Sequence, residues 1–196
     1  MSAFVRYANE MPATPLRSSL TSTRPLGFPG VRSIWVMSPV TTILELRPMR
    51  EDEFASWLPQ MREHYAADMV EQGGMSEERA AAKAASDVEL LFPNEVPSPQ
   101  HSVYVIEGDG EPVGTLWLTQ RQETMEPCLF VYEVHVDERF RGRGYGRAAM
   151  LFAEEEAQRR GIDRVALNVF GGNAVARGLY RSLGYEENAV AMSKKL

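Results

Sequence analysis

The sequence predicts a single α/β domain, and three observations support this. A chain of 196 residues, of which 44% are hydrophobic and 24% charged, can fill one core but is too short for two comfortable domains. The spacing of apolar residues changes repeatedly between a period of two, typical of strands, and a period of 3.6, typical of helices. Clusters of Gly and Pro separate these segments. The expected order is β-α-α-β-β-β-α-β-α-β, without internal repeats.

The first 40 residues differ in composition from the rest. They contain five prolines, four arginines and only one acidic residue, Glu10. This composition superficially resembles an organelle transit peptide, but the prolines interrupt any amphipathic periodicity. We therefore expect residues 1–40 to be a disordered N-terminal extension and residues 41–196 to form the domain. One hypothesis is that Met37 is the physiological start.

The first half of the domain is expected to hold one strand and two helices. Residues 42–47 are predicted to form the strand, and the acidic residues 51–53 open a helix that continues to about Gln72. An alanine-rich helix, capped by Ser76, then extends to about Phe92.

The second half is expected to be a meander followed by two strand–helix units. The predicted strands are 103–107, 113–120, 129–136, 165–169 and 186–193, and the predicted helices are 145–160 and 173–183. The turn at 108–111 has the composition of a hairpin loop. The strand 129–136 carries β-branched and aromatic residues with little charge, which favours a central position in the sheet.

Charge and cysteine content narrow the possible partners and compartment. The formal net charge of −6 and the pI near 5.2 argue against a general nucleic-acid binder. No run approaches the roughly 18 apolar residues of a membrane span. The single cysteine, Cys128, excludes an intramolecular disulfide and is compatible with a reducing compartment. We expect a cytoplasmic protein with neither nucleic-acid nor membrane partners.

The sequence lacks the residue patterns of several common catalytic sites. The three histidines, His64, His101 and His135, are far apart and have no metal-ligand spacing, so we expect no metal site. No Gly-x-Ser-x-Gly elbow occurs, and Cys128 has no activating base nearby in the sequence.

The segment from Arg141 to Gly146 has the features of an anion site between a strand and a helix. Its glycines and the surrounding arginines are Gly142, Gly144, Gly146, Arg141, Arg143 and Arg147. The first amides of a helix lack internal acceptors, and glycines let an anion approach them. A P-loop would need Gly-Lys-Ser/Thr, and the dinucleotide pattern would need a glycine at Arg147. Both alternatives are excluded.

This segment resembles the cofactor loop of the GNAT superfamily of N-acetyltransferases, which reads Arg/Gln-x-x-Gly-x-Gly/Ala after a hydrophobic strand. Residues 167–185 are similar to the family's strand-asparagine-helix-tyrosine segment. The resemblance covers residues 42–196 in element order and is specific over residues 129–185. It implies a mixed, mostly antiparallel sheet of about six to seven strands with about four helices. It also implies acetyl transfer from acetyl-CoA to a primary amine.

The resemblance further implies roles for individual residues. The loop Arg141, Gly142, Arg143, Gly144, Tyr145, Gly146 and Arg147 would bind the cofactor, the amides of Arg143–Arg147 holding its pyrophosphate. The backbone around Val134 and Val136 would pair with the pantetheine arm, where the two flanking strands splay apart. Asn173 would hydrogen-bond the cofactor, and Tyr180 would face its sulfur and protonate the leaving thiolate. Asn173 also suits a plain helix N-cap, and Tyr180 a core position.

An amine attacks a thioester only as the free base, so a positioned carboxylate or imidazole must accept its proton. Glu133 is the candidate base, and strand alternation groups it with Leu129, Val131 and His135 on one face. His135 is therefore an alternative candidate for the base. A salt bridge with an arginine would be a purely structural reason for a charged Glu133 in this apolar strand.

The acceptor is left open between a small-molecule amine and a protein amine. In the family it lies against the first two helices, here within residues 51–99. Glu63, Asp68 and Glu71 could line the acceptor side, but a solvent-facing position is expected for each. Relatives often form homodimers, which is possible here. The alternative function is a non-catalytic CoA-binding sensor or interaction module on the same fold.

Overall fold

The computed structural model describes residues 33–37, 42–95, 99–121, 127–192 and 194. These residues form one six-stranded sheet in the order β1-β2-β3-β4-β5-β6. The strands are β1 (Ser33–Met37), β2 (Thr42–Pro48), β3 (His101–Gly108), β4 (Glu111–Arg121), β5 (Cys128–Val136) and β6 (Val165–Leu167). All neighbours are antiparallel except β5 and β6, which are parallel. The prediction of a mixed, mostly antiparallel sheet is confirmed.

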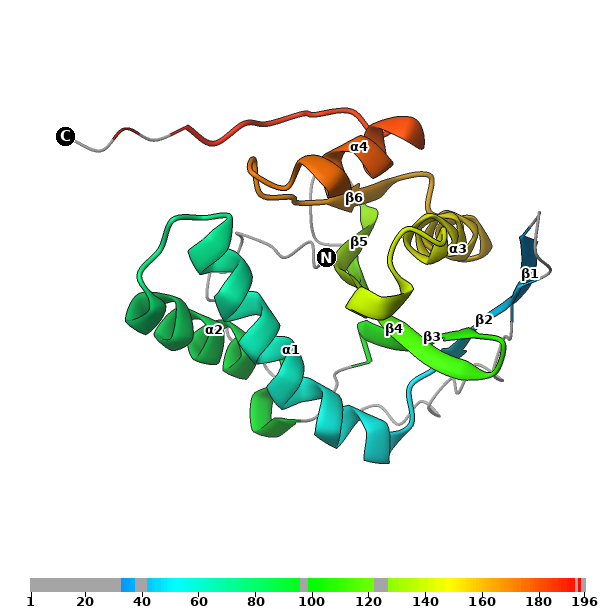
Figure 1. Ribbon diagram of the computed structural model, residues 1–196, viewed down its shortest axis with the longest axis horizontal. Helices are drawn as coiled ribbons and strands as arrows, with labels where there is room; N and C mark the ends of the chain where they lie inside the picture. Colours follow the sequence, from blue (N-terminus) through cyan, green and yellow to red (C-terminus); the bar gives the residue numbers. More distant parts are fainter. Residues whose placement is uncertain (1–32, 38–41, 96–98, 122–126, 193, 195–196) are drawn as a thin grey trace, which may run out of the picture.

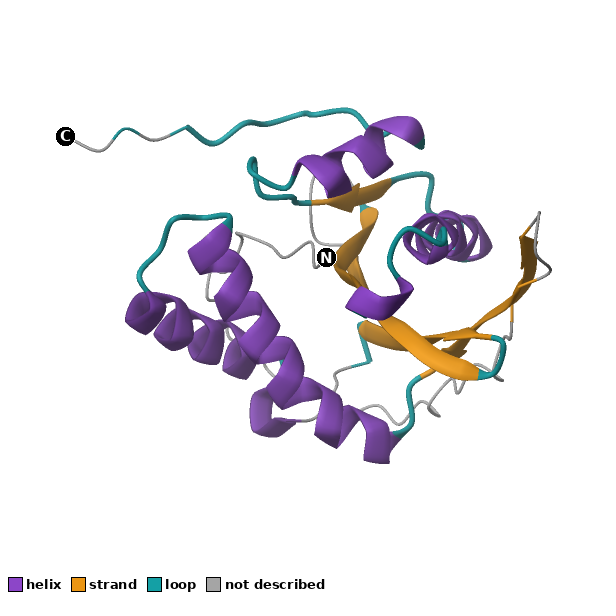
Figure 2. Cartoon of the chain, viewed as in Figure 1, coloured by secondary structure: helices purple, strands orange, loops and turns teal. Residues whose placement is uncertain are grey.

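Four α-helices and two short 3-10 helices surround the sheet in the described part of the chain. They are α1 (Glu51–Glu71), α2 (Glu77–Leu91), η1 (Pro93–Glu95), η2 (Glu138–Phe140), α3 (Tyr145–Arg159) and α4 (Ala174–Ser182). The helices α1 and α2 form a pair on one side of the sheet, α3 lies on the other side, and α4 lies beside β6 (Figures 1 and 2). None of the helices described has the length and apolar character needed to cross a membrane.

The α1–α2 side of the sheet buries an aromatic core. Trp57 of α1 meets Trp117 of β4 edge-to-face, with ring centroids 5.9 Å apart, and Phe92 follows α2 into the same cluster. Buried α1 residues recur at helical spacing: Phe54, Trp57, Leu58, Met61, Tyr65 and Met69. This stripe fixes which side of α1 faces the sheet.

The α3 side of the sheet buries a separate, more aliphatic core. Leu46 of β2, Ile106 of β3, Leu116 of β4 and Phe152 of α3 are all fully buried there. The 3.6-residue pattern predicted for this helix is confirmed, since its apolar positions from Tyr145 to Ala157 face the sheet. The sheet is therefore covered on both faces.

A β-bulge in β5 determines which face each of its side chains reaches. Trp117 of β4 pairs with Glu133, whereas the next residue, Leu118, pairs with Val131, so Tyr132 is an extra residue in β5. Before the bulge, Leu129 and Val131 face the α3 core. After it, Val134 and Val136 take that side, and Glu133 turns toward α1. The predicted grouping of Glu133 with Leu129 and Val131 is wrong, because the extra residue reverses the alternation.

Two strands differ from those predicted. Residues 33–37 fall inside the segment expected to be unstructured, yet they form β1, paired with Thr42–Leu46 of β2. This strand is held by cross-strand backbone hydrogen bonds, which local composition does not reveal. The predicted strand 186–193 does not form in its described part, residues 186–192, all of which are exposed. Val190 and Met192 there are 70% and 92% exposed, so the segment packs on neither face of the sheet. Residues 1–32 and 38–40 lie outside the described part of the chain.

Candidate active site

The pairing of β5 and β6 ends before β5 does. Only Leu129–Val131 pair with Val165–Leu167, so the C-terminal part of β5 has no neighbouring strand on this side among the described residues. The predicted splay between these strands is present. Val134 and Val136 lie in this unpaired part, with their side chains in the α3 core. Their backbone is at the opening, where the family resemblance predicts the pantetheine arm.

The turn that follows β5 has the backbone of an anion site. Gly142 and Gly144 have φ values of +76° and +89°, a region that favours glycine, and Gly144 is the N-cap of α3. A Cβ atom built on Gly142 would meet nothing within 4 Å, so the space beside the turn is open. Tyr145 starts α3, and neither a capping side chain nor an acidic residue occupies its first turn. The first amides of α3 are therefore accessible to an anion.

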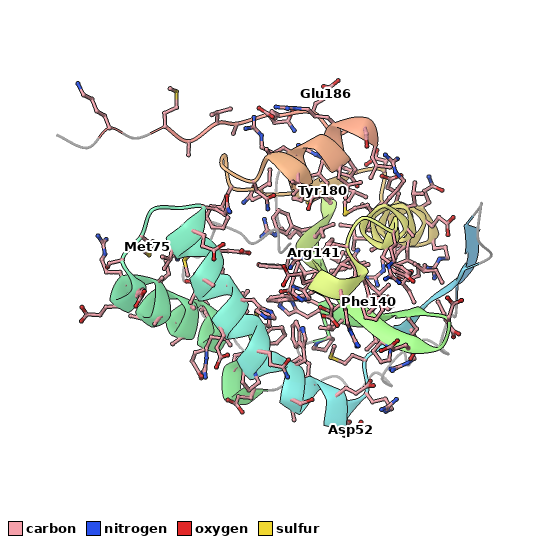
Figure 3. The ribbon with its side chains drawn as sticks, in the orientation of Figure 1. Asp52, Met75, Phe140, Arg141, Tyr180 and Glu186 are labelled. Atoms are coloured by element: carbon pink, nitrogen blue, oxygen red, sulfur yellow. The ribbon has the colours of Figure 1, made fainter. Side chains whose placement is uncertain are left out.

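Arginines surround this turn. The Arg141 Nε donates to the backbone oxygen of Val136 at 3.1 Å, which ties the turn to the end of β5. The guanidinium of Arg143 lies 5.5 Å from the ring centroid of Phe140, and Arg147 donates to the hydroxyl of Ser182 on α4. Figure 3 shows Arg141 between Phe140 and Tyr180 of α4. The predicted cluster of positive charge is thus brought together at one end of α3.

The helix α4 carries the two remaining predicted residues. Asn173 is its N-cap and accepts a hydrogen bond from the Ala176 amide at 3.1 Å. Tyr180 is 5% exposed, and burial raises the pKa of its hydroxyl. A tyrosine with a raised pKa stays protonated at neutral pH, so it can donate a proton but cannot act as a base.

A cleft of about 250 Å³ lies between α1 and the sheet, on the opposite face from α3. It is lined by Met49, Glu53, Ser56, Trp57, Gln60, Met61, His64, Val105, Pro112, Gly114, Thr115, Glu133, His135 and Asp137. Apolar side chains of α1 and the loop before it form one wall, and polar side chains of β4 and β5 form another. The cleft suits a small molecule with an apolar part and a polar end.

Glu133 is the buried acid of this cleft. It is 1% exposed, and the Thr115 hydroxyl of the adjacent strand donates to its Oε2 at 3.4 Å. A buried carboxylate facing a cleft is well placed to bind a cation.

His135 lies beside Glu133 and stacks on His64 of α1. The two imidazole centroids are 4.5 Å apart, with 10° between the ring planes. Burial, reinforced by the nearby His64 and Arg141, lowers the pKa of His135 to about 3, so its ring is neutral at physiological pH. Its Nε2 lies 3.3 Å from an Asp137 carboxylate oxygen, and its Nδ1 is buried without a hydrogen-bond partner.

Sequence reasoning missed several members of this site. His64, Thr115 and Asp137 all line the cleft near Glu133, although nothing in the local sequence marks them. Sequence spacing placed the histidines far apart, whereas the packing of α1 on β5 brings His64 and His135 together. Asp68 is half-buried, and burial raises the pKa of its carboxyl to about 6, so it is not the solvated side chain expected. Glu63 and Glu71 are exposed as expected.

Known proteins share this arrangement of elements. A model of the acetyltransferase (GNAT) family matches residues 58–185. The uncharacterized N-acetyltransferase YycN of Bacillus subtilis is 33% identical over 152 residues, which cover 77% of this chain and 97% of that protein. Its crystal structure aligns with a TM-score of 0.72 over 78% of this chain and 98% of that one.

A more distant structure shares the fold. The aminoglycoside N-acetyltransferase AAC(6')-Iy, solved in complex with CoA, aligns with a TM-score of 0.54 at 16% identity, over 81% of this chain and 99% of that one. The family match, the identity to YycN and the strand–turn–helix geometry at Gly142–Gly144 agree with one another. The chain therefore belongs to the acetyltransferase (GNAT) family and is an acetyl-CoA-dependent N-acetyltransferase.

Proposed function

We propose that the protein acetylates a small primary amine that binds in the cleft between α1 and β5, with Glu133 as the general base. The observation that carries this proposal is a nearly inaccessible carboxylate in the wall of a small cleft. The cleft lies beside the strand that leads to the predicted cofactor turn. A volume of about 250 Å³ favours a small molecule over a folded protein surface as the acceptor.

The charges of the cleft favour an ammonium ion. Its acidic side chains are Glu53, Glu133 and Asp137, and it has no lysine or arginine among its lining residues. Glu53 is paired with Arg47, whereas Glu133 and Asp137 line the cleft and would attract a cation. The apolar wall that includes Trp57 and Met61 would hold the carbon part of the amine.

One proton of the bound ammonium would pass to Glu133, and the free amine would then attack the thioester carbonyl of acetyl-CoA. The attack forms a C–N bond and a tetrahedral oxyanion; collapse of that species breaks the C–S bond, and the second nitrogen proton leaves to water. Thr115 holds the Glu133 carboxylate from the neighbouring strand. His135 is the rival base, but its pKa of about 3 makes it a weak proton acceptor.

The departing thiolate would take its proton from Tyr180. Burial keeps this hydroxyl protonated, as a general acid requires. We place the pyrophosphate on the amides at the start of α3, among Arg141, Gly142, Arg143, Gly144, Tyr145, Gly146 and Arg147. The backbone of Val134 and Val136 would pair with the pantetheine arm at the β5–β6 opening. Asn173 caps α4 and would also contact the cofactor. The complex of AAC(6')-Iy with CoA supports binding of this cofactor by the fold.

An amine panel tests the proposal. Purified protein is incubated with acetyl-CoA and a set of small amines, and free CoA and acetylated product are measured. With an accepted amine, Glu133→Gln should lower kcat about 10²- to 10⁴-fold, the range for loss of a general base, while the affinity for acetyl-CoA stays unchanged. The exposed Glu155→Gln on α3 is the matched control. Unaltered turnover in Glu133→Gln would exclude Glu133 as the base.

A further inference from the structure

We propose that His64, Glu133 and His135 bind a divalent transition-metal ion, Zn²⁺, and that the bound ion blocks binding of the acceptor amine. One ligand atom from each of these residues lies within 4.8 Å of the other two. Two imidazoles and one carboxylate are a donor set that suits Zn²⁺ and leaves a fourth position open. Mg²⁺, which prefers oxygen ligands, is a poor match.

The ligand atoms of His64, Glu133 and His135 can reach coordinating distances with little movement. Tetrahedral Zn²⁺ with bonds of about 2.0–2.1 Å needs ligand atoms about 3.3 Å apart. The two β5 residues are held by the sheet, since Glu133 pairs with Trp117 and His135 with Thr115. His64 is exposed on α1 and can turn toward them. The two rings already stack face to face, with centroids 4.5 Å apart, so a turn of the His64 side chain would bring one of its nitrogens toward the site.

The surroundings of His135 also favour a metal. Its Nδ1 is buried without a hydrogen-bond partner, so it has a lone pair that no other group uses. The Asp137 carboxylate, 3.3 Å from the Nε2 of the same ring, adds negative charge beside the site and helps to orient the ring.

The consequence for the enzyme is competition at one carboxylate. A substrate ammonium and Zn²⁺ are both cations, and both would use Glu133. An ion held by Glu133 keeps this carboxylate from accepting the amine proton, so Zn²⁺ should inhibit and a chelator should restore activity. This consequence rests on the proposed role of Glu133. The metal site itself does not, so binding is measured first and without acetyl-CoA.

The test titrates the full chain with Zn²⁺ alone by calorimetry, and with Co²⁺ while its visible d–d absorption is recorded. The expected result is one saturable site whose Co²⁺ spectrum is displaced by Zn²⁺ and is unaffected by excess Mg²⁺. His64→Ala removes one ligand at an exposed position, which keeps the fold intact, and should weaken Zn²⁺ binding at least 10-fold. Glu63→Gln, at the exposed neighbouring position of α1, should bind Zn²⁺ as the unmodified protein does.

A second variant tests the contribution of β5. Asp137→Asn removes the carboxylate beside His135 and should weaken Zn²⁺ binding by about 10-fold. Circular dichroism confirms that each variant is folded. The absence of a saturable site in the unmodified chain would overturn the proposal, as would equal Zn²⁺ affinity in His64→Ala. Neither result would bear on acetyl transfer, which the amine panel measures separately.

Discussion

Tyr180 combines burial with a position at the edge of the β5–β6 opening. Its ring packs in the core that α3 and α4 share with β5, and the Tyr185 ring lies 5.9 Å away. Burial raises the pKa of the Tyr180 hydroxyl, so the group is a proton donor over the whole physiological range. A structural tyrosine would have the same burial. The two roles differ only in the contribution of the hydroxyl to turnover.

Tyr180→Phe should keep the packing and remove the acid. We expect kcat to fall about 10²-fold or more, because the thiolate would leave without a proton, while binding of CoA stays close to that of the unmodified protein. Steady-state kinetics and calorimetry with CoA measure the two quantities. Tyr104→Phe, at a buried tyrosine of β3 that accepts from Arg160 under α3, is the matched control. A Tyr180→Phe protein with full turnover would assign Tyr180 to packing alone.

The sequence identified Glu133 and His135 but not their surroundings. Both residues stand out in an otherwise apolar strand, and that signal is local. His64, Thr115 and Asp137 carry no such signal, because each is an ordinary polar residue until tertiary packing brings it to the cleft. The spacing argument against a metal-binding cluster considered only sequence separation, and α1 crosses β5 from a distant part of the chain.

At the scale of elements, the junction of β2 with α1 is held by a charged network. Arg47 of β2 donates to both carboxylate oxygens of Glu53 in the first turn of α1, at 2.7 and 2.8 Å, and to Glu107 of β3 at 2.7 Å. Glu53 also accepts from the Arg50 amide, which completes a capping box. These contacts fix the direction in which α1 leaves the sheet, and hence the wall of the cleft.

The network should make stability depend on acid pH. The hydrogen bond from Arg47 lowers the pKa of Glu53 from 4.5 to about 2. A carboxyl group with a lowered folded-state pKa stabilises the fold fully above its unfolded-state pKa, and this contribution is lost as the pH falls toward 2. Glu53→Gln should therefore lower the free energy of unfolding by about 1 kcal/mol at pH 7, and by progressively less between pH 4.5 and 2.

Urea titrations at pH 7, 4.5 and 3 measure this difference. Glu155→Gln, exposed on α3, serves as control and should show no such convergence with the unmodified protein. A difference for Glu53→Gln that stays constant with pH would mean that the carboxylate charge is not what stabilises the junction.

Comparison of the predicted and observed strands shows which structural features depend on local sequence alone. Positions 101–108 and 111–121 formed the predicted hairpin because Asp109 and Gly110 adopt positive φ, as the turn composition indicates. The bulge at Tyr132 was not predictable, since a register shift depends on the partner strand and leaves no mark in β5 itself. Strand formation also depends on a partner strand, so β1 was not predicted. Conversely, a strand was predicted at 186–193, but residues 186–192 do not form one.

At the scale of the whole molecule, one sheet joins two cores of different composition. Trp57 and Trp117 belong to the core beneath α1 and α2, whereas Phe152 belongs to the core beneath α3. Alternate residues of β3, β4 and β5 contribute to both. The strands are thus the physical link through which a change on one face reaches the other.

Phe152→Ala should show whether the two cores unfold together. Phe152 is fully buried and packs edge-to-face on Tyr104 at 4.9 Å, so its truncation should cost about 3–5 kcal/mol. In a cooperative domain, tryptophan fluorescence, to which Trp57 and Trp117 on the far face contribute, and far-UV circular dichroism should shift to the same lower urea midpoint. A fluorescence midpoint that stays in place while the dichroism midpoint moves would show that the faces unfold separately.

The extra residue in β5 has a consequence for how this gene can change. Deletion of the Tyr132 codon would remove the one residue that the pairing with β4 skips, so Glu133 to Val136 would keep their present sides. A one-residue deletion elsewhere in β5 would instead exchange the sides of the residues between the deletion and the bulge. The strand can therefore lose a residue without reversing its faces only at the bulge. A library of one-residue deletions along β5 should show the mildest loss of acetylation at Tyr132.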